Sequence, residues 1–205
     1  MMYTPVNKQA GFSFVETLVA ITILLIVIIG PLTISSNTAK STSFSSEQVV
    51  AFFLAEEGAE IAQKVRDDLL LRNQLDVSDG NYVAEPWGVF TDTSGTFSAC
   101  YISENENGCA LEYSNGNNPA LEPVTTCTAG GCPLYYDETD GERTRYTKDS
   151  VGNDETIYTR TLYFETAGLV DQVKVTSKVT WFTTGQRKAE EVHVETYLFN
   201  VYGDA

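Results

Sequence analysis

The feature that most constrains this chain is an apolar run of 21 residues near its N-terminus, Phe12 to Leu32, in which Glu16 is the only charged residue. As a helix, the run would rise about 30 Å at roughly 1.5 Å per residue, which matches the hydrocarbon core of a bilayer. A carboxylate in hydrocarbon costs roughly 2.5–3.5 kcal/mol on insertion scales, so Glu16 needs a partner. The sequence therefore predicts one membrane-spanning helix with a charge that must be compensated.

The residues ahead of this run indicate how Glu16 could be compensated. A secretory signal carries its charges before the apolar core and is cut behind it at small residues, whereas here the charge lies inside the run. The stretch 35–39 offers only a poor cleavage site behind it. If the chain were cut between Gly11 and Phe12, the new α-amino group of Phe12 would place a cation at the head of the helix. Glu16 could then pair with its own terminus or, in an assembly, with a neighbour's.

Gly11-Phe12 followed by Glu16, the fifth residue after the proposed cut, resembles the class III leader and N-terminus of type IV pilins and pseudopilins. The resemblance covers Gln9 to Ile34, and Lys8 matches the basic residue of the leader. It implies that a prepilin peptidase cuts after Gly11 and methylates the N-terminus of Phe12. It also implies that Glu16 guides polymerisation into a helical filament. The alternative is an ordinary single-span anchor in which Glu16 has no such role.

The resemblance also implies partners and a location. The partners are the prepilin peptidase, other pilin or pseudopilin subunits and an inner-membrane assembly platform, and no cofactor is implied. The subunit would be a single-pass membrane protein with Lys8 on the cytoplasmic side, and then part of an extracellular filament or exposed at the cell surface or in the periplasm. On assembly, helix contacts would replace lipid contacts along Phe14, Leu18, Ile21, Leu25 and Ile28.

Gly30 and Pro31 predict a kink or local unwinding, because proline removes a backbone hydrogen bond and clashes with the preceding turn. The resemblance implies that helices loosen here on packing into a filament. A kink at the membrane surface is equally compatible, and both can hold.

A helical pattern resumes behind the hydroxyl-rich stretch 35–46 and ends at Asn73. We therefore predict one helix from about Ser13 to Arg72, bent at Pro31, in two halves. Residues 12–34 would be the membrane or filament-core half, and residues 35–72 the amphipathic half that carries the globular domain. The residues that follow three- and four-residue steps in the second half, and so would share one face of the helix, are Phe52, Ala55, Ala59, Ala62, Arg66 and Leu69. Gly58 within it suggests close packing against a sheet.

Residues 73–155 predict a loop-rich insertion with short strands, because aromatic runs alternate there with turn-forming residues. An exported location favours disulfides among its four cysteines, and three pairings are possible. The expected pairing joins sequence neighbours, Cys100 with Cys109 and Cys127 with Cys132. A zinc site is the rival, but the spacing lacks the C-x2-C knuckle and His193 is the only histidine. The acidic clusters at 104–107 and 137–142 do not fit a calcium loop and are expected to be solvated.

Residues 156–205 predict three antiparallel strands joined by hairpins, since apolar and polar residues alternate there with a period of two. One face of such a sheet can pack on residues 35–72, so residues 35–72 and 73–205 would form one globular domain. The predicted fold class is α+β. A long kinked N-terminal helix packs its second half on an antiparallel sheet, with a loop-rich, disulfide-containing insertion and residues 1–11 as a cleaved leader.

The charge balance argues against general nucleic-acid binding. The chain has 13 Lys and Arg against 28 Asp and Glu, for a net charge of −15, and affinity for phosphates grows with the number of cationic contacts. The single local basic patch, Lys174, Lys178, Arg187 and Lys188, is expected to be a solvated strand face.

No enzyme activity, metal site or cofactor is predicted. Neither a Gly-x-Ser-x-Gly motif nor a phosphate-binding loop is present, and His193 is expected to be an exposed strand residue.

Three classes of function follow from these observations. The first is a filament subunit of a pilus, a secretion pseudopilus or a DNA-uptake filament, and its large insertion favours a minor or tip-associated role. The second is a membrane-anchored exported domain that binds a ligand through aromatic loops at 82–90 and 135–136 and is not assembled into a filament. The third is a secreted hydrolase with an uncleaved anchor, which the missing catalytic set disfavours.

Overall fold

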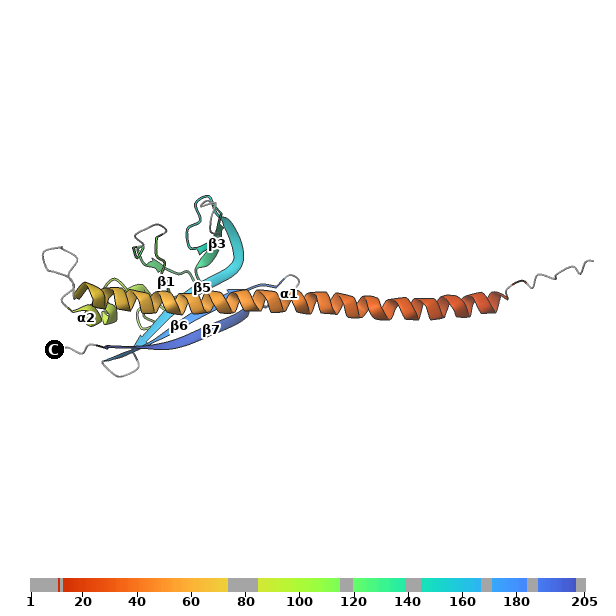
Figure 1. The fold of residues 1–205 in the computed structure, drawn as a ribbon, viewed down its shortest axis with the longest axis horizontal. Helices are drawn as coiled ribbons and strands as arrows, with labels where there is room; N and C mark the ends of the chain where they lie inside the picture. Colours follow the sequence, from red (N-terminus) through yellow and green to blue (C-terminus); the bar gives the residue numbers. More distant parts are fainter. Residues whose placement is uncertain are drawn as a thin grey trace, which may run out of the picture. The chain divides into compact units, whose positions relative to one another are not determined.

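The computed structural model describes residue 11 and residues 13–73, 85–114, 120–138, 145–166, 171–183 and 188–201. The chain divides into two compact units, Met1–Ser46 and Glu47–Ala205. Helix α1, Phe14–Asn73, contributes its first part to one unit and its second part to the other (Figure 1). The predicted long helix is therefore confirmed to within one residue at each end.

In the first unit, α1 continues through Gly30 and Pro31 without a break in its helical assignment. No neighbouring side chain requires a glycine at position 30, since a Cβ atom there would have no atom within 4 Å. The kink predicted at Gly30 and Pro31 stays a prediction for the assembled state.

The second unit contains a seven-stranded antiparallel sheet built around β5, Asp154–Thr166. On one side of β5 lie β6, Gln172–Trp181, and then β7, Glu190–Phe199. These are the three predicted C-terminal strands. The other side of β5 pairs with two short strands, β1, Cys109–Ala110, and β3, Pro133–Asp137.

The segment predicted as a loop-rich insertion with short strands contains such strands, and in addition two short helical segments that were not predicted. Besides β1 and β3 it supplies β2, Thr125–Thr126, and β4, Arg145–Thr147, which pair with β1 and β3 respectively. It also contains a short helix α2, Pro86–Thr91, and a 3-10 turn η2, Ser98–Cys100. Pairing with β5 explains this order, because a long strand satisfies the backbone of short neighbours that could not stand alone.

The second part of α1 packs on the sheet through small residues. Its buried face comprises Ala51, Leu54, Ala55, Ala59, Ala62 and Val65. This differs from the predicted face at Phe52, which is 42% exposed. Alanine allows the helix to approach the sheet closely, and Gly58 lies at the closest point, next to Ser177 of β6 and Arg160 of β5.

Aromatic side chains fill the core at the other end of this interface. Trp87, Phe90, Phe97 and Phe164 are buried and pack in one cluster with ring centroids 5.3–5.8 Å apart. The buried Tyr101 hydroxyl donates a hydrogen bond to the carbonyl of Phe90 at 2.9 Å, and burial raises the pKa of this phenol.

Two disulfides join the cysteines as sequence neighbours, Cys100 with Cys109 and Cys127 with Cys132. The first is fully buried in the main core, and the second lies in a small cluster with Ala110. Gly108 makes the first possible, since its φ of +69° and its approach to the Leu162 carbonyl leave no room for a side chain just before Cys109.

Replacing Gly58 by alanine is expected to destabilise the second unit, although helix propensity alone would favour alanine by about 1 kcal/mol. An alanine Cβ would clash with the Ser177 hydroxyl and would lie 3.1 Å from Arg160 Cδ and 3.2 Å from Ser177 Cβ. Such overpacking typically costs about 1–3 kcal/mol. The measurement is denaturant unfolding of the full chain in detergent.

The matched background for this prediction is Ser177→Ala. Within the part of the chain that the structure describes, the Ser177 hydroxyl is buried and has no hydrogen-bond partner, so removing it also relieves the nearest clash. Gly58→Ala should therefore cost less in that background than in the parent. If Gly58→Ala changed the free energy of unfolding by the same amount in both backgrounds, the close contact between position 58 and Ser177 would be contradicted.

Candidate processing and assembly site

The predicted cleavage position lies just before α1. Gly11 is exposed, Phe12 lies outside the described residues, and α1 begins at Phe14. A Cβ atom at Gly11 would have no atom within 4 Å, and Gly11 is not among the glycines with positive φ. The part of the fold that the structure describes therefore places no demand for glycine at this position. A demand from outside the fold, such as the subsite of a peptidase, would account for it.

Glu16 lies in the first turn of α1 and is exposed. The positive end of the helix dipole favours a carboxylate there, typically by about 0.3–1 kcal/mol. The described residues provide no ion pair for Glu16, and Lys8 and Phe12 are not described. This carboxylate is therefore open to a cation that the described part of the chain does not supply.

The apolar side chains that follow Glu16 are exposed in the isolated chain. Each of Phe14, Leu18, Ile21, Leu25 and Ile28 has about half or more of its surface accessible. Length and composition make α1 able to cross a membrane. In water such a surface would be unstable, so bilayer lipid or neighbouring helices must cover it.

Hydroxyl groups within this apolar part of α1 are satisfied by the helix itself. The Thr17 hydroxyl donates to the Phe14 carbonyl at 2.8 Å, Thr22 donates to Val19 at 2.8 Å, and Thr33 donates to Ile29 at 3.0 Å. Each bond removes the cost of an unpaired polar group in a hydrocarbon or helix-packed environment. Glu16 is thus the one charged group of the apolar run, and the described residues give it no ion-pair partner.

A second exposed apolar surface lies on α1 within the second unit. Val49, Phe52 and Phe53 are 54%, 42% and 62% exposed, and the rings of Phe52 and Phe53 meet edge to face at 6.3 Å. By helical periodicity, Val49 and Phe53 lie on the side of the helix away from the buried alanines, and Phe52 lies at the margin between the two sides. Sequence periodicity could not separate the two sides, because both carry small or apolar residues.

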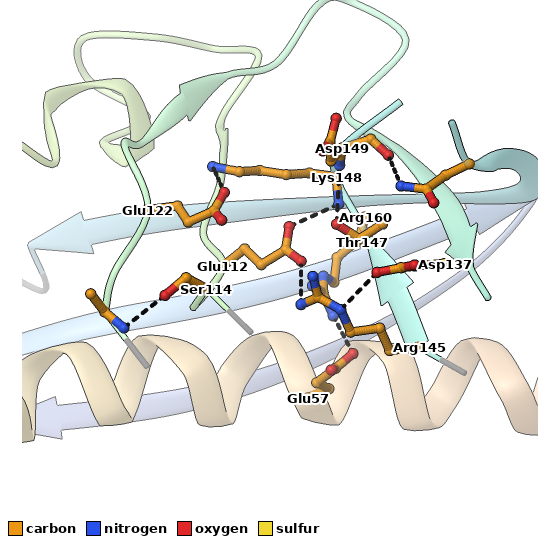
Figure 2. A network of polar contacts seen from close by, with 12 residues as sticks. Glu57, Glu112, Ser114, Glu122, Asp137, Arg145, Thr147, Lys148, Asp149 and Arg160 are labelled. Carbon is orange, nitrogen blue, oxygen red and sulfur yellow. Dashed lines mark hydrogen bonds and ion pairs between the residues drawn. The ribbon is translucent and has the colours of Figure 1, made fainter. Parts of the chain in front are cut away.

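A charged cluster of the second unit, which includes two buried carboxylates, holds loops in place. Figure 2 shows Arg145 of β4 between two carboxylates, Glu112 at 3.1 Å and Asp137 at 3.3 Å. The backbone N–H of Lys148 donates to Glu112 at 2.9 Å, and its ammonium donates to the Pro123 carbonyl at 2.7 Å. These bonds tie the β3–β4 hairpin to the segment that follows β1, which is a structural role.

A second ion pair secures α1 to the sheet. Arg160 of β5 is buried and reaches Glu57 of α1 at 2.6 Å (Figure 2). Its guanidinium also donates to the Leu54 carbonyl at 3.3 Å. The Glu57 side chain is half exposed, so solvent screens the pair. The main effect of the ion pair is to give the buried guanidinium of Arg160 a hydrogen-bond acceptor.

The acidic clusters do not form a metal site in the part of the chain that is described. No group of three or more His, Cys, Asp or Glu is placed there to hold an ion. In the first cluster, the Asn105 amide closes its own loop by donating to the Ala99 and Gly108 carbonyls, both at 3.0 Å. In the second, Asp137 bonds Arg145, and residues 139–144 lie outside the described ranges.

Two lysines of the predicted basic patch, Lys174 and Lys178, form ion pairs with nearby carboxylates. Lys174 bridges Glu195 at 3.1 Å and Glu165 at 3.3 Å, and these hydrogen bonds raise the pKa of its ammonium. Lys178 pairs with Glu191 at 3.3 Å, and Arg187 lies outside the described residues. His193 is exposed on β7, as predicted. These contacts are those of a solvated strand face.

The aromatic loops suggested as a ligand surface are mostly structural. Trp87 and Phe90 are buried in the core, which corrects the prediction for that stretch, while Tyr82 lies outside the described residues. Tyr135 and Tyr136 are half-buried, and Tyr136 packs edge to face on Tyr146 at 5.6 Å. Trp87 and Phe90 are buried because both lie on α2, which directs their rings into the core.

A family model for the prokaryotic N-terminal methylation motif matches residues 6–30. The matched segment contains Gly11, Phe12 and Glu16 together with most of the apolar run. No curated protein and no solved structure matches the chain. The comparison therefore bears on the N-terminal segment, where the described residues place no atom against Gly11 and no ion-pair partner beside Glu16.

Proposed function

We propose that this chain, whose N-terminus is the class III prepilin-type leader of type IV pilins and pseudopilins, is a minor or tip-associated structural subunit of a type IV pilus or secretion pseudopilus. The leader and the long apolar helix make it a single-pass membrane-anchored subunit that is later exposed at the surface or in the periplasm. A prepilin peptidase processes it, and other pilins are its assembly partners.

The observation that carries the proposal is Glu16, an open carboxylate in the first turn of an exposed apolar helix, next to a methylation motif. Cleavage after Gly11 would create an α-amino group on Phe12 close to that turn. In a filament, the amine of one subunit could meet Glu16 of the next, and the pair would neutralise both charges inside the apolar core.

Polymerisation then replaces lipid by protein around the first part of α1. Lipid is as apolar as the side chains, so packing and the Glu16 pair, rather than the hydrophobic effect, would direct the contact. The exposed Val49, Phe52 and Phe53 would extend helix contacts beyond the membrane-spanning part. There water is the competing solvent, and burying a large apolar side chain is worth about 1.5–3 kcal/mol.

The minor or tip-associated role is supported by the connection between α1 and β5. It carries α2, η2, four short strands and both disulfides, and thereby gives the second unit a large surface of its own. Loops placed on a rigid scaffold are where proteins concentrate specific recognition.

The test is the N-terminus and location of the mature protein. We expect mass spectrometry to find N-methylated Phe12 as the first residue, with the mass of residues 1–11 lost, and the protein to be present in sheared filaments at low abundance. An intact Met1, or a cut near Ala39, would contradict the proposal. Normal processing with the protein confined to the membrane fraction would instead favour a membrane-anchored ligand-binding domain.

A further inference from the structure

The outer edge of β7 is an unpaired strand in the part of the chain that the structure describes. β7 pairs with β6 over Glu190–Phe199, and no described strand lies on its other side (Figure 1). In an antiparallel pair, every second residue directs its N–H and C=O away from the partner strand. At the end of β7, Arg66 donates to the Phe199 carbonyl at 3.2 Å, and the remainder of the edge, 190–198, is open among the described residues.

The two faces of β7 differ in chemistry. The face towards α1 carries Val192, Val194 and Thr196, which are half-buried, whereas the residues directly opposite on β6, Val179, Ser177 and Val175, are fully buried. Cover by the rest of the unit therefore decreases from β6 to β7 over residues 192–196, while Leu198 near the end of β7 stays buried in the core. A further strand would bring apolar side chains beside Val192 and Val194 and extend this layer.

On the outer face of β7, acidic side chains form ion pairs with lysines of β6, and one of these lysines also pairs with a carboxylate of β5. Lys174 of β6 serves two carboxylates, Glu165 of β5 and Glu195 of β7, and Lys178 serves Glu191 of β7. Across the sheet, charge alternates from acidic on β5 to basic on β6 and acidic on β7. A cationic residue on an added strand would continue this alternation and give Glu195 a partner of its own.

The same charges disfavour a second copy of this strand. Antiparallel pairing of two β7 strands about His193 would place Glu191 of each copy opposite Glu195 of the other. Like charges directly opposite in a sheet are destabilising. Carboxylates on the edge thus oppose self-association while they attract a basic strand.

We propose that β7 is a docking edge for an extended segment of a partner protein in which Lys or Arg alternates with β-branched apolar residues. The segment adds a strand to the sheet, with backbone hydrogen bonds for affinity and Glu191 and Glu195 for selection. Its cations face Glu191 and Glu195, and its apolar residues lie beside Val192 and Val194. This proposal stands independently of filament assembly.

Strand β6, which pairs with the inner edge of β7, provides the sequence of a peptide probe. A synthetic peptide copying Gln172–Trp181 has lysines with the spacing that meets Glu191 and Glu195 and valines on the opposite face. We expect the fluorescent peptide, at monomeric concentrations, to bind the full chain in detergent, with anisotropy as the readout. The same peptide with both lysines changed to glutamate should bind at least tenfold more weakly. Equal binding of the two peptides, or no binding of the lysine peptide, would overturn the proposal.

N-methylation of the peptide separates strand addition from general charge attraction. Alternate backbone N–H groups of a strand point to opposite edges, and an added strand pairs through one edge only. Methylating the odd-numbered nitrogens and methylating the even-numbered nitrogens should therefore give opposite results, with binding abolished for one set and retained for the other. If the two methylated peptides bound equally well or equally poorly, strand addition would be overturned.

The location is tested with a photo-reactive group at the centre of the peptide, which should crosslink to the tryptic fragment that follows Lys188. Crosslinks confined to other fragments would overturn the assignment to β7. The protein variant Glu191→Gln/Glu195→Gln should weaken binding several-fold, and Glu60→Gln, an exposed acid on α1, should leave it unchanged.

Discussion

Replacing Glu16 by glutamine should remove the protein from filaments while leaving leader cleavage intact. Glutamine keeps the size of the side chain and its place in the first turn of α1, so the peptidase still meets the same backbone before Phe14. What it loses is the negative charge that would pair with an α-amino group. We expect a loss of at least tenfold in the amount recovered from sheared filaments, measured by immunoblot against the membrane fraction.

The size of this effect follows from the surroundings of the charge. An amine buried among apolar helices without its carboxylate is far more costly than the same amine in water, and breaking a buried pair from one side typically costs about 3–5 kcal/mol. Even 1.4 kcal/mol changes an equilibrium constant about tenfold. The matched control is Glu60→Gln, which removes one exposed carboxylate from the same helix and should assemble normally. Full incorporation of the Glu16 variant would show that this charge has no role in assembly.

Replacing Gly11 by valine should block removal of the leader altogether. Among the described residues, no atom lies within 4 Å of a Cβ at position 11, so we expect valine to leave their fold undisturbed. Failure of processing must then come from the peptidase, whose subsite next to the cut bond would have to accept a branched side chain. We expect the protein isolated from cells that contain the peptidase to keep the mass of residues 1–11.

The control for this variant is Gly30→Val, which has the same chemistry and the same open surroundings within the same unit. It should be cut normally, because position 30 is far along the helix from the bond between Gly11 and Phe12. If the Gly11 variant still lost its leader, the cut would lie elsewhere. If both variants were blocked, the effect would be one of membrane insertion rather than of the cleavage site.

Most of the architecture could be predicted from local sequence patterns. The apolar run, the position of Glu16 and the motif around Gly11 are contiguous in sequence, so their meaning does not depend on the rest of the fold. The alternation of β6 and β7 likewise follows from the two-residue period of a strand. The pairing of Cys100 with Cys109 and Cys127 with Cys132 was favoured for a similar reason, since close neighbours meet easily in short loops.

Other features depended on contacts between distant residues. Phe52 fits the helical period of the buried face, yet the structure exposes it, because α1 meets the sheet through alanines and Gly58. Trp87 and Phe90 read as loop aromatics, yet a single turn of helix after Pro86 turns them into the core. Neither outcome could be taken from the local sequence, because burial is decided by what packs on a side chain.

The N-terminal methylation motif, the long helix with its single carboxylate in the apolar run, and the antiparallel strands that follow could be predicted from sequence. These are properties of neighbouring residues and of backbone periodicity. The exposed face of α1 in the second unit, the contact of Ser177 with Gly58 and the open acidic edge of β7 among the described residues emerged from the folded chain. Those are properties of surfaces that exist only once strands distant in sequence have paired and the helix has covered one side of them.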